Sequence, residues 1–243
     1  MKIITLNTWG NSGPYEERWS FFLEELVTDK PDILCLQEVF SSALVEKVKE
    51  AFPYFNILSA YEAGLVIMTR FPVVESQIIK YKTISQNERE NRQAILAKLE
   101  IDGKQITITN THLSWRPEDE TIRYKQVKEL LQVLVNKKDT SLLAGDFKDV
   151  RASASIEEIE KAGYVNLCLL CHPDSKNMTW DNQNPFIQTH SVKFPDRQID
   201  FLFLHQKLIT PNTIKSCNVI FNHPNPNGIY PSDHYGILAE IKF

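Results

Sequence analysis

The most constraining feature of this 243-residue sequence is a series of short apolar runs, each of which stops at a polar residue. Residues 2–7 and 32–38 are two such runs, and their length and composition predict β-strands. Residues 16–30 lie between them and carry apolar side chains at helical spacing. Strands that alternate with helices in this way predict an α/β fold.

The rest of the chain continues the alternation but also contains strands that follow one another without a helix. Further helices are predicted at residues 41–52, 119–137 and 153–163. Further strands are predicted at residues 55–61, 64–70, 73–83, 94–101, 104–113, 141–147, 198–205, 213–221 and 235–243. Hairpins mixed with helical crossovers favour two mixed sheets with helices outside, in a single domain spanning residues 1–243. Residues 171–198 show no periodicity, and long loops of this kind are often functional.

Charge and hydropathy narrow the classes of protein that fit. The formal net charge is −4, whereas proteins that bind duplex nucleic acid without specificity are usually basic. No run approaches the ~20 apolar residues of a membrane span. The amino-terminal sequence MKIITLNTWG also lacks an apolar run of signal-peptide length. We therefore expect a monomeric cytoplasmic protein without a transmembrane segment.

Polar residues of catalytic type gather at the predicted strand ends. Taken alone, each has a structural explanation, such as a turn, a helix cap or a core histidine, so the functional interpretation depends on their joint arrangement. The residues concerned are Asn7, Glu38, Asn110, His112, Asp146, Asp200, Asp233 and His234.

This set of residue types suits phosphoryl chemistry with a hard divalent cation. Mg²⁺ prefers oxygen ligands and is typically held by one or two carboxylates, with water and phosphate oxygens completing the shell. Glu38 is the candidate anchor, and the Asn7 amide is the candidate second group. A zinc site would need a second cysteine pair beside Cys168 and Cys171, and the sequence has none.

The histidines supply candidates for proton transfer. His234 is the candidate general base for an attacking water, since a histidine pKa can lie near the operating pH. Asp200 interrupts the apolar run QIDFLFL, where an unpaired carboxylate would be costly, so we expect it to hold His234. His112 is a candidate donor to a phosphate oxygen that gains charge during the reaction.

Seven short motifs resemble the ordered motif series of the endonuclease/exonuclease/phosphatase superfamily, which has the deoxyribonuclease I-like fold. They are LNTWG, LQEV, GLVIMTR, NTHLS, AGDF, RQIDFLF and PSDHYG, and they span residues 6–236. The resemblance implies a four-layer α/β sandwich, with two packed mixed β-sheets flanked by helices. It also implies metal-dependent hydrolysis of a phosphoester by in-line attack of an activated water, with Mg²⁺ as the cofactor and Mn²⁺ as the alternative.

The resemblance carries roles to individual residues. Asn7, Glu38 and Asp233 match metal-side positions, and His112 matches a phosphate-contacting histidine. Asp146 matches the aspartate that orients the nucleophile. Asp200 and His234 match the family's aspartate–histidine pair.

One position departs from the family pattern. The family has G-D-x-N after the strand, whereas this chain has Lys148 two residues after Asp146. A lysine ammonium can neutralise a phosphate oxygen, but it cannot accept a hydrogen bond from water and it repels a nearby metal. Because residues two apart on a strand face the same side, we expect Lys148 to point into the site with Asp146 and Glu38. The alternative to an active enzyme is a weakened or catalytically silent module that binds a phosphorylated ligand or a protein.

The residues within the motifs resemble those of two branches of the superfamily. The segment from Thr179 resembles neutral sphingomyelinase-like and tyrosyl-DNA phosphodiesterase-like members, and PSDHYG resembles the latter. The helix that contains Arg123 and Gln126 also resembles these members. The alternative is that both side chains lie on a solvated face of this helix. Trp115 and Trp180 are candidates to stack on a base, or else to anchor loops. The expected substrate is a nucleic-acid end or a small phosphodiester.

Overall fold

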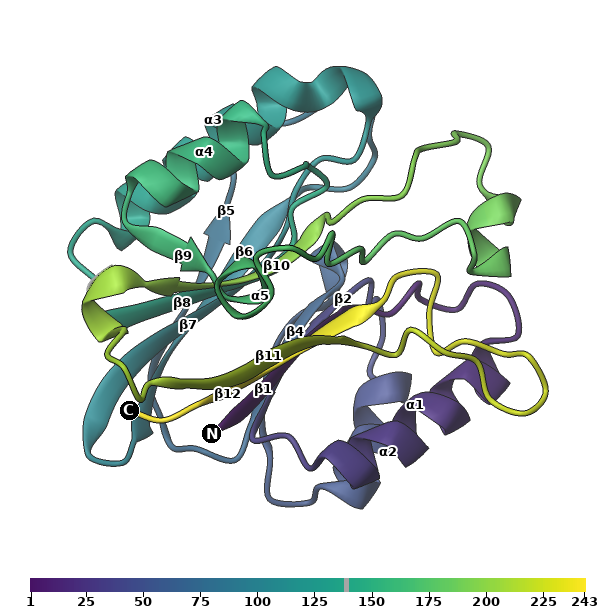
Figure 1. The fold of residues 1–243 in the computed structure, drawn as a ribbon, viewed down its shortest axis with the longest axis horizontal. Helices are drawn as coiled ribbons and strands as arrows, with labels where there is room; N and C mark the ends of the chain where they lie inside the picture. Colours follow the sequence, from purple (N-terminus) through teal and green to yellow (C-terminus); the bar gives the residue numbers. More distant parts are fainter. Residues whose placement is uncertain (138–139) are drawn as a thin grey trace.

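Two six-stranded β-sheets pack face to face in the computed structural model, which describes residues 1–137 and 140–243 (Figure 1). The first sheet has the spatial order β11 (Ile214–Ile220), β12 (Gly236–Ile241), β1 (Lys2–Asn7), β2 (Ile33–Gln37), β4 (Leu65–Thr69) and β3 (Asn56–Ala60). The second has the order β5 (Val73–Lys80), β6 (Gln93–Ile101), β7 (Lys104–His112), β8 (Ser141–Asp146), β10 (Asp200–His205) and β9 (Tyr164–Asn166).

Helices cover the outer faces of both sheets (Figure 1). The first sheet carries α1 (Tyr15–Asp29) and α2 (Ala43–Ala51), and the second carries α3 (Glu120–Leu134) and α4 (Ala154–Lys161). The short α5 (Leu167–Cys171) packs against β10 and β11. The expected four-layer α/β sandwich is therefore confirmed. None of the described helices has the length and apolar content needed to span a membrane.

Strand β2 shows how the sequence builds these layers. Ile33 and Cys35 face the core between the sheets, whereas Leu34 and Leu36 face the core beneath α1 and α2. Successive side chains of a strand point to opposite faces, so a strand buried on both sides reads as a continuous apolar run. Cys35 is therefore a fully buried core thiol.

The register of the second sheet brings three candidate residues side by side. His112 at the end of β7 pairs with Asp146 at the end of the parallel β8. Asp146 in turn pairs with Asp200 at the start of the antiparallel β10. Because β10 runs in the opposite direction, its first residue lies at the same edge as the last residues of β7 and β8.

Buried amides join the two sheets at this edge. Asn7 of β1 donates through Nδ2 to Asp146 Oδ2 of β8 over 2.8 Å. Deeper in the core, Gln37 Nε2 donates to Asn110 Oδ1 over 2.7 Å. Asn110 Nδ2 donates to the backbone oxygens of Leu36 and Val66, each over 2.9 Å. Asn110 therefore connects the two sheets by hydrogen bonds, and it does not line the cavity described below.

Gly145 is required where β8 approaches β7. Its φ is 141°, and a Cβ there would lie 2.0 Å from the Thr111 backbone oxygen. We expect Gly145→Ala to lower the free energy of unfolding by at least about 2 kcal/mol, measured by urea denaturation. Gly103→Ala is the matched control, since its φ is 76° but a Cβ would meet nothing within 4 Å. Equal losses in the two variants would show that the close approach to β7 is unimportant.

Candidate active site

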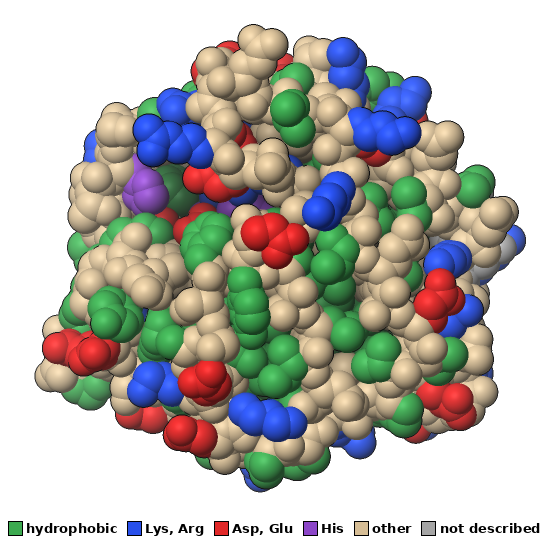
Figure 2. Space-filling view, turned by 180° about the vertical axis from the view of Figure 1, so that it is seen from behind, with side chains coloured by type: hydrophobic (Ala, Val, Ile, Leu, Met, Phe, Trp, Pro, Cys, Tyr) green, Lys and Arg blue, Asp and Glu red, His purple; other side chains and the backbone are tan. Residues whose placement is uncertain are grey.

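A cavity of about 270 Å³ opens where the strand ends of the two sheets meet. Histidine, acidic and basic side chains gather in a hollow of the surface among hydrophobic ones (Figure 2). The polar lining residues include Glu38, Glu90, Arg92, His112, Lys148, His190, Arg197 and Asp233. The aromatic lining residues are Trp9, Phe40, Trp115, Trp180 and Phe194.

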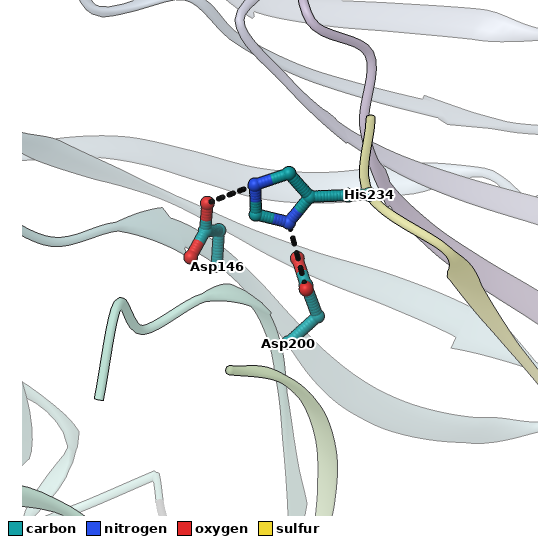
Figure 3. A group of neighbouring side chains, drawn as sticks. All are labelled: Asp146, Asp200 and His234. Carbon is teal, nitrogen blue, oxygen red and sulfur yellow. Dashed lines mark hydrogen bonds and ion pairs between the residues drawn. The ribbon is translucent and has the colours of Figure 1, made fainter. Parts of the chain in front are cut away.

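Asp200 and His234 form a fully buried pair beside this cavity. His234 Nδ1 lies 2.9 Å from Asp200 Oδ2, and the imidazole is placed between the carboxylates of Asp200 and Asp146 (Figure 3). Burial and the Lys148 charge disfavour the imidazolium, but the carboxylates of Asp200, Asp146 and Asp233 together outweigh them and raise the pKa of His234 to about 9. The expected pairing of Asp200 with His234 is confirmed.

Asp146 is the charged centre of the cluster. Its Oδ2 lies 2.7 Å from Lys148 Nζ and 2.8 Å from Asn7 Nδ2. Burial opposes its negative charge, yet Lys148 and His234 together hold the pKa of this carboxyl well below its usual range. Asp146 is therefore ionised, and its Oδ2 is contacted by both Lys148 and Asn7.

Lys148 lies in the site as expected, but it does not reach the site by alternation along an extended strand, so the expected reason was wrong. The strand ends at Asp146, and Lys148 follows it in the left-handed region with a φ of 52°. Its backbone nitrogen donates to Asp146 Oδ1 over 3.0 Å, which closes a turn that directs the side chain inward. Burial opposes its charge, but Asp146 and then Glu38 outweigh burial and raise the pKa of Lys148.

The Lys148 ammonium also contacts the candidate base. Its Nζ lies 3.2 Å from His234 Nε2. Nε2 can accept a hydrogen bond from the ammonium only while the imidazole is neutral, with its proton on Nδ1 facing Asp200. A proton that reaches Nε2 must therefore displace Lys148 from it.

His112 presents unused hydrogen-bonding groups. Both of its ring nitrogens are buried without a hydrogen-bond partner among the described residues, and Nε2 lies 3.5 Å from Asp146 Oδ2. Burial and then the Arg92 charge hold the pKa of His112 well below its usual value, so the ring is neutral. An unsatisfied N–H at a cavity wall is suited to donate to a bound ligand.

Glu38 offers the carboxylate that best fits a divalent cation. It is half-buried, lines the cavity and accepts from Asn7 Nδ2 through Oε1 over 2.9 Å. No described residue donates to its Oε2, so one oxygen remains for a ligand. Asn7 Oδ1 accepts from the Trp9 backbone nitrogen over 3.0 Å, so Asn7 orients Glu38 through its amide nitrogen. One carboxylate at a polar cavity fits Mg²⁺, which keeps several waters.

The other acidic candidates are already engaged. Asp233 Oδ2 lies 2.7 Å from His190 Nε2, and its Oδ1 accepts from Ser232 Oγ over 3.1 Å. Asp146, Asp200 and His234 present ligand atoms within 4.8 Å of one another, a spacing at which a metal could bind. The Lys148 ammonium already supplies the positive charge there. We therefore place the candidate metal at Glu38, while the metal-side role of Asp233 stays a prediction.

The structure adds residues that the sequence did not single out. Trp9, Arg92, His190 and Arg197 all line the cavity. Trp9 lies within the LNTWG motif, so its position was a usable signal, whereas His190 and Arg197 lie in the stretch without periodicity. That stretch was expected to be functional, and its contribution to the cavity wall agrees with that expectation.

The remaining candidates have structural contacts. Trp180 is buried and packs edge-to-face on His234, with ring centroids 5.1 Å apart, so it anchors a loop and supports the base. Trp115 is partly exposed at the cavity wall. Arg123 is buried and ion-paired to Asp149 over 3.0 Å, and buried Gln126 donates to Ser114 Oγ. A solvated helix face is therefore the wrong explanation for Arg123 and Gln126.

Comparison with known proteins agrees with this arrangement. Residues 4–234 match the model of the Endonuclease/Exonuclease/phosphatase family. Human nocturnin is 26% identical, over 94% of this chain and 58% of its own length. Tyrosyl-DNA phosphodiesterase 2 of Xenopus laevis is 23% identical, over 98% of this chain and 66% of its own length. The chain thus spans only about three fifths of nocturnin.

A solved structure extends the comparison to three dimensions. D. rerio TDP2, complexed with single strand DNA product, superposes with a TM-score of 0.82 at 21% identity. The superposition covers 100% of this chain and 99% of that one. At this level of identity the likeness establishes the fold.

Proposed function

Since this chain belongs to the endonuclease/exonuclease/phosphatase family, we propose that it is a Mg²⁺-dependent phosphodiesterase. Its substrate is a nucleic-acid end or a small phosphodiester, and a water attacks phosphorus in line with the leaving group. Residues 1–243 act as one catalytic domain, for which we keep the predictions of a monomer and a cytoplasmic location. The relatives named for tyrosyl-DNA phosphodiesterase activity support the substrate class.

One observation carries the proposal: a buried Asp200–His234 pair adjoins the ionised Asp146, directly behind the cavity-lining Lys148 and His112. His234 Nε2 lies 3.8 Å from Asp146 Oδ2, and the Lys148 ammonium contacts both atoms. A water that takes the place of the ammonium would meet both a base and a carboxylate acceptor. Two groups converging on one position can orient a nucleophile and remove its proton.

Each residue of the site has its own role in this reaction. His234 accepts the water proton at Nε2, and Asp200 stabilises the imidazolium through Nδ1–H. Asp146 accepts the other hydrogen bond of the water. His112 donates to a phosphate oxygen. Glu38, oriented by Asn7, holds Mg²⁺, which when bound supplies positive charge to the phosphate oxygens.

Lys148 has two roles in this sequence of events. In the free site it occupies His234 Nε2, and a bound phosphate oxygen offers the ammonium a charged acceptor instead. Transfer of Lys148 to the phosphate leaves Nε2 open for the water. Because the pKa of His234 is raised to about 9, only the small neutral fraction, in which Nε2 can accept from Lys148, can act as the base at pH 7, so turnover should rise with pH up to about 9.

A substrate screen tests the proposal. Purified protein with Mg²⁺ is assayed on bis-p-nitrophenyl phosphate, p-nitrophenyl phosphate and short 5′-blocked oligonucleotides. We expect turnover of the diester and of the blocked ends, with slower turnover of the monoester. Turnover of the monoester alone would make the protein a phosphatase and contradict the diesterase assignment.

The second candidate function is a silent binding module, and Lys148 is the observation that favours it. In that case the ammonium replaces the metal charge permanently and the site only holds a phosphorylated ligand. Ligand binding without turnover in the same screen would support this alternative.

Replacing Lys148 separates the two candidates. We expect Lys148→Asn to tighten Mg²⁺ binding and to raise phosphodiesterase turnover, because a positive charge beside Glu38 and Asp146 is removed. The measurement is turnover of both proteins across a Mg²⁺ titration. Lower turnover of the variant at every Mg²⁺ concentration would instead show that the contact of Lys148 with the phosphate contributes more to turnover than its positive charge costs in Mg²⁺ binding.

A further inference from the structure

Arg197 is a cation at the cavity wall that the proposed chemistry does not use. It lies in the loop before β10 and lines the cavity. Its backbone is fixed, because Arg197 N donates to Trp180 O over 2.9 Å and Trp180 N donates to Arg197 O over 3.0 Å. The residue therefore projects from a defined point close to the Asp200–His234 pair.

The guanidinium of Arg197 is held flat and left without an acceptor. Its Cζ lies 3.7 Å from the centre of the Phe194 ring. Its Nε is buried with no hydrogen-bond partner among residues 1–137 and 140–243, and the side chain makes no ion pair within those residues. Stacking on a ring occupies the face of a guanidinium and leaves its in-plane N–H groups available.

Nearby carboxylates do not neutralise this charge. Asp149 is paired with Arg123 over 3.0 Å, and Asp146 is paired with Lys148 over 2.7 Å. Burial lowers the pKa of Arg197 to about 10, with Asp146 close enough to oppose that shift. Arg197 is thus still charged at neutral pH and lies in the electrostatic range of the reacting centre.

We propose that Arg197 binds a second phosphate group of the substrate, the one adjacent to the scissile phosphate in a nucleic-acid strand. A planar guanidinium with free edge donors matches a phosphate in bidentate geometry. Lys148 and His112 face the scissile group, so one cavity then holds two anionic groups at separate points. The inference rests on the proposed function and narrows its substrate from any small phosphodiester to a nucleotide end with at least two phosphates.

Two chromogenic esters test the proposal by turnover. One is the p-nitrophenyl ester of thymidine 5′-phosphate, and the other is the same ester with an added 3′-phosphate. We expect wild type to prefer the second ester in kcat/KM by at least about tenfold, the scale of a charge-assisted hydrogen bond. In Arg197→Met, which keeps the stem on Phe194, the ratio should fall close to one.

The matched control is Lys193→Met. Lys193 lies in the same loop, is exposed and donates to the Gln188 backbone oxygen, and it does not line the cavity. Removing its charge should leave the preference for the second phosphate intact. If Lys193→Met and Arg197→Met lower the kcat/KM ratio of the two esters equally, the positive charge of the loop as a whole, and not Arg197, creates the preference.

Calorimetry makes the test independent of catalysis. We expect thymidine 3′,5′-bisphosphate to bind metal-free wild type at least about tenfold more tightly than thymidine 5′-phosphate, and Arg197→Met to remove the difference. Equal affinities for wild type would overturn the Arg197 site. If neither ester is hydrolysed yet this difference is found, the phosphodiesterase proposal fails and the Arg197 site stands.

Discussion

Replacing Glu38 with alanine is expected to lower phosphodiesterase turnover by at least ~100-fold, the scale of losing a charge-stabilising group at a reacting centre. Glu38 combines a free oxygen with a place on the cavity wall, and Asn7 already orients it over 2.9 Å. The variant should also lose the thermal stabilisation that added Mg²⁺ gives to wild type, since binding to the native state raises stability.

Glu62→Ala provides the control for loss of one negative charge. Glu62 is exposed and does not line the cavity. Its replacement should leave both turnover and the Mg²⁺ effect unchanged. Turnover that survives both EDTA and the Glu38 replacement would eliminate the metal assignment.

Loss of His234 is the second large effect. We expect His234→Ala to lower turnover by about 10²–10⁴-fold, the usual contribution of a positioned general base. Asp200→Asn should cause a loss of similar order, because the 2.9 Å contact to Nδ1 sets the tautomer and stabilises the imidazolium. The double variant should be scarcely worse than His234→Ala alone, as for residues that share one task.

The experiment needs variants that are folded and a comparison outside the site. Thermal unfolding of each variant establishes that the buried pair has been changed without loss of the fold. His172→Ala is the comparison, because His172 contacts Asn218 over 3.0 Å on the surface and lies outside the catalytic cavity. Any loss of turnover caused by His172→Ala should add fully, as a free energy, to the loss caused by His234→Ala. Full additivity of the Asp200 and His234 losses would show that these two residues act separately.

Much of the site could be predicted because its residues end strands. Asn7, His112 and Asp146 each end an apolar run, and the last residue of a strand lies where the strand leaves the sheet. The resemblance of the seven ordered motifs to one superfamily then assigned these residues to a common site. The local sequence indicates these strand ends because a polar residue interrupts an apolar run, although Asn7, His112 and Asp146 are themselves buried.

Residues placed by loop geometry could not be predicted in the same way. Lys148 reaches the site through a positive φ after the strand, and Glu38 also has a positive φ of 60°. Nothing in an apolar pattern reports such a turn. His190 and Arg197 are placed by long-range contacts of an aperiodic loop, such as the 2.7 Å contact of His190 with Asp233. Contacts of this kind depend on the assembled fold, so a single sequence does not reveal them.

The most direct test of the central claim is hydrolysis in ¹⁸O-labelled water with Mg²⁺ and then with EDTA, followed by mass spectrometry of the phosphate-containing product. Attack of an activated water on phosphorus predicts one ¹⁸O atom in each product phosphate, formed with Mg²⁺ and not with EDTA. Product without label in the phosphate would contradict attack at phosphorus, and unchanged hydrolysis in EDTA would contradict the role of the metal. Absence of product while phosphorylated ligands still bind would identify the chain as a binding module.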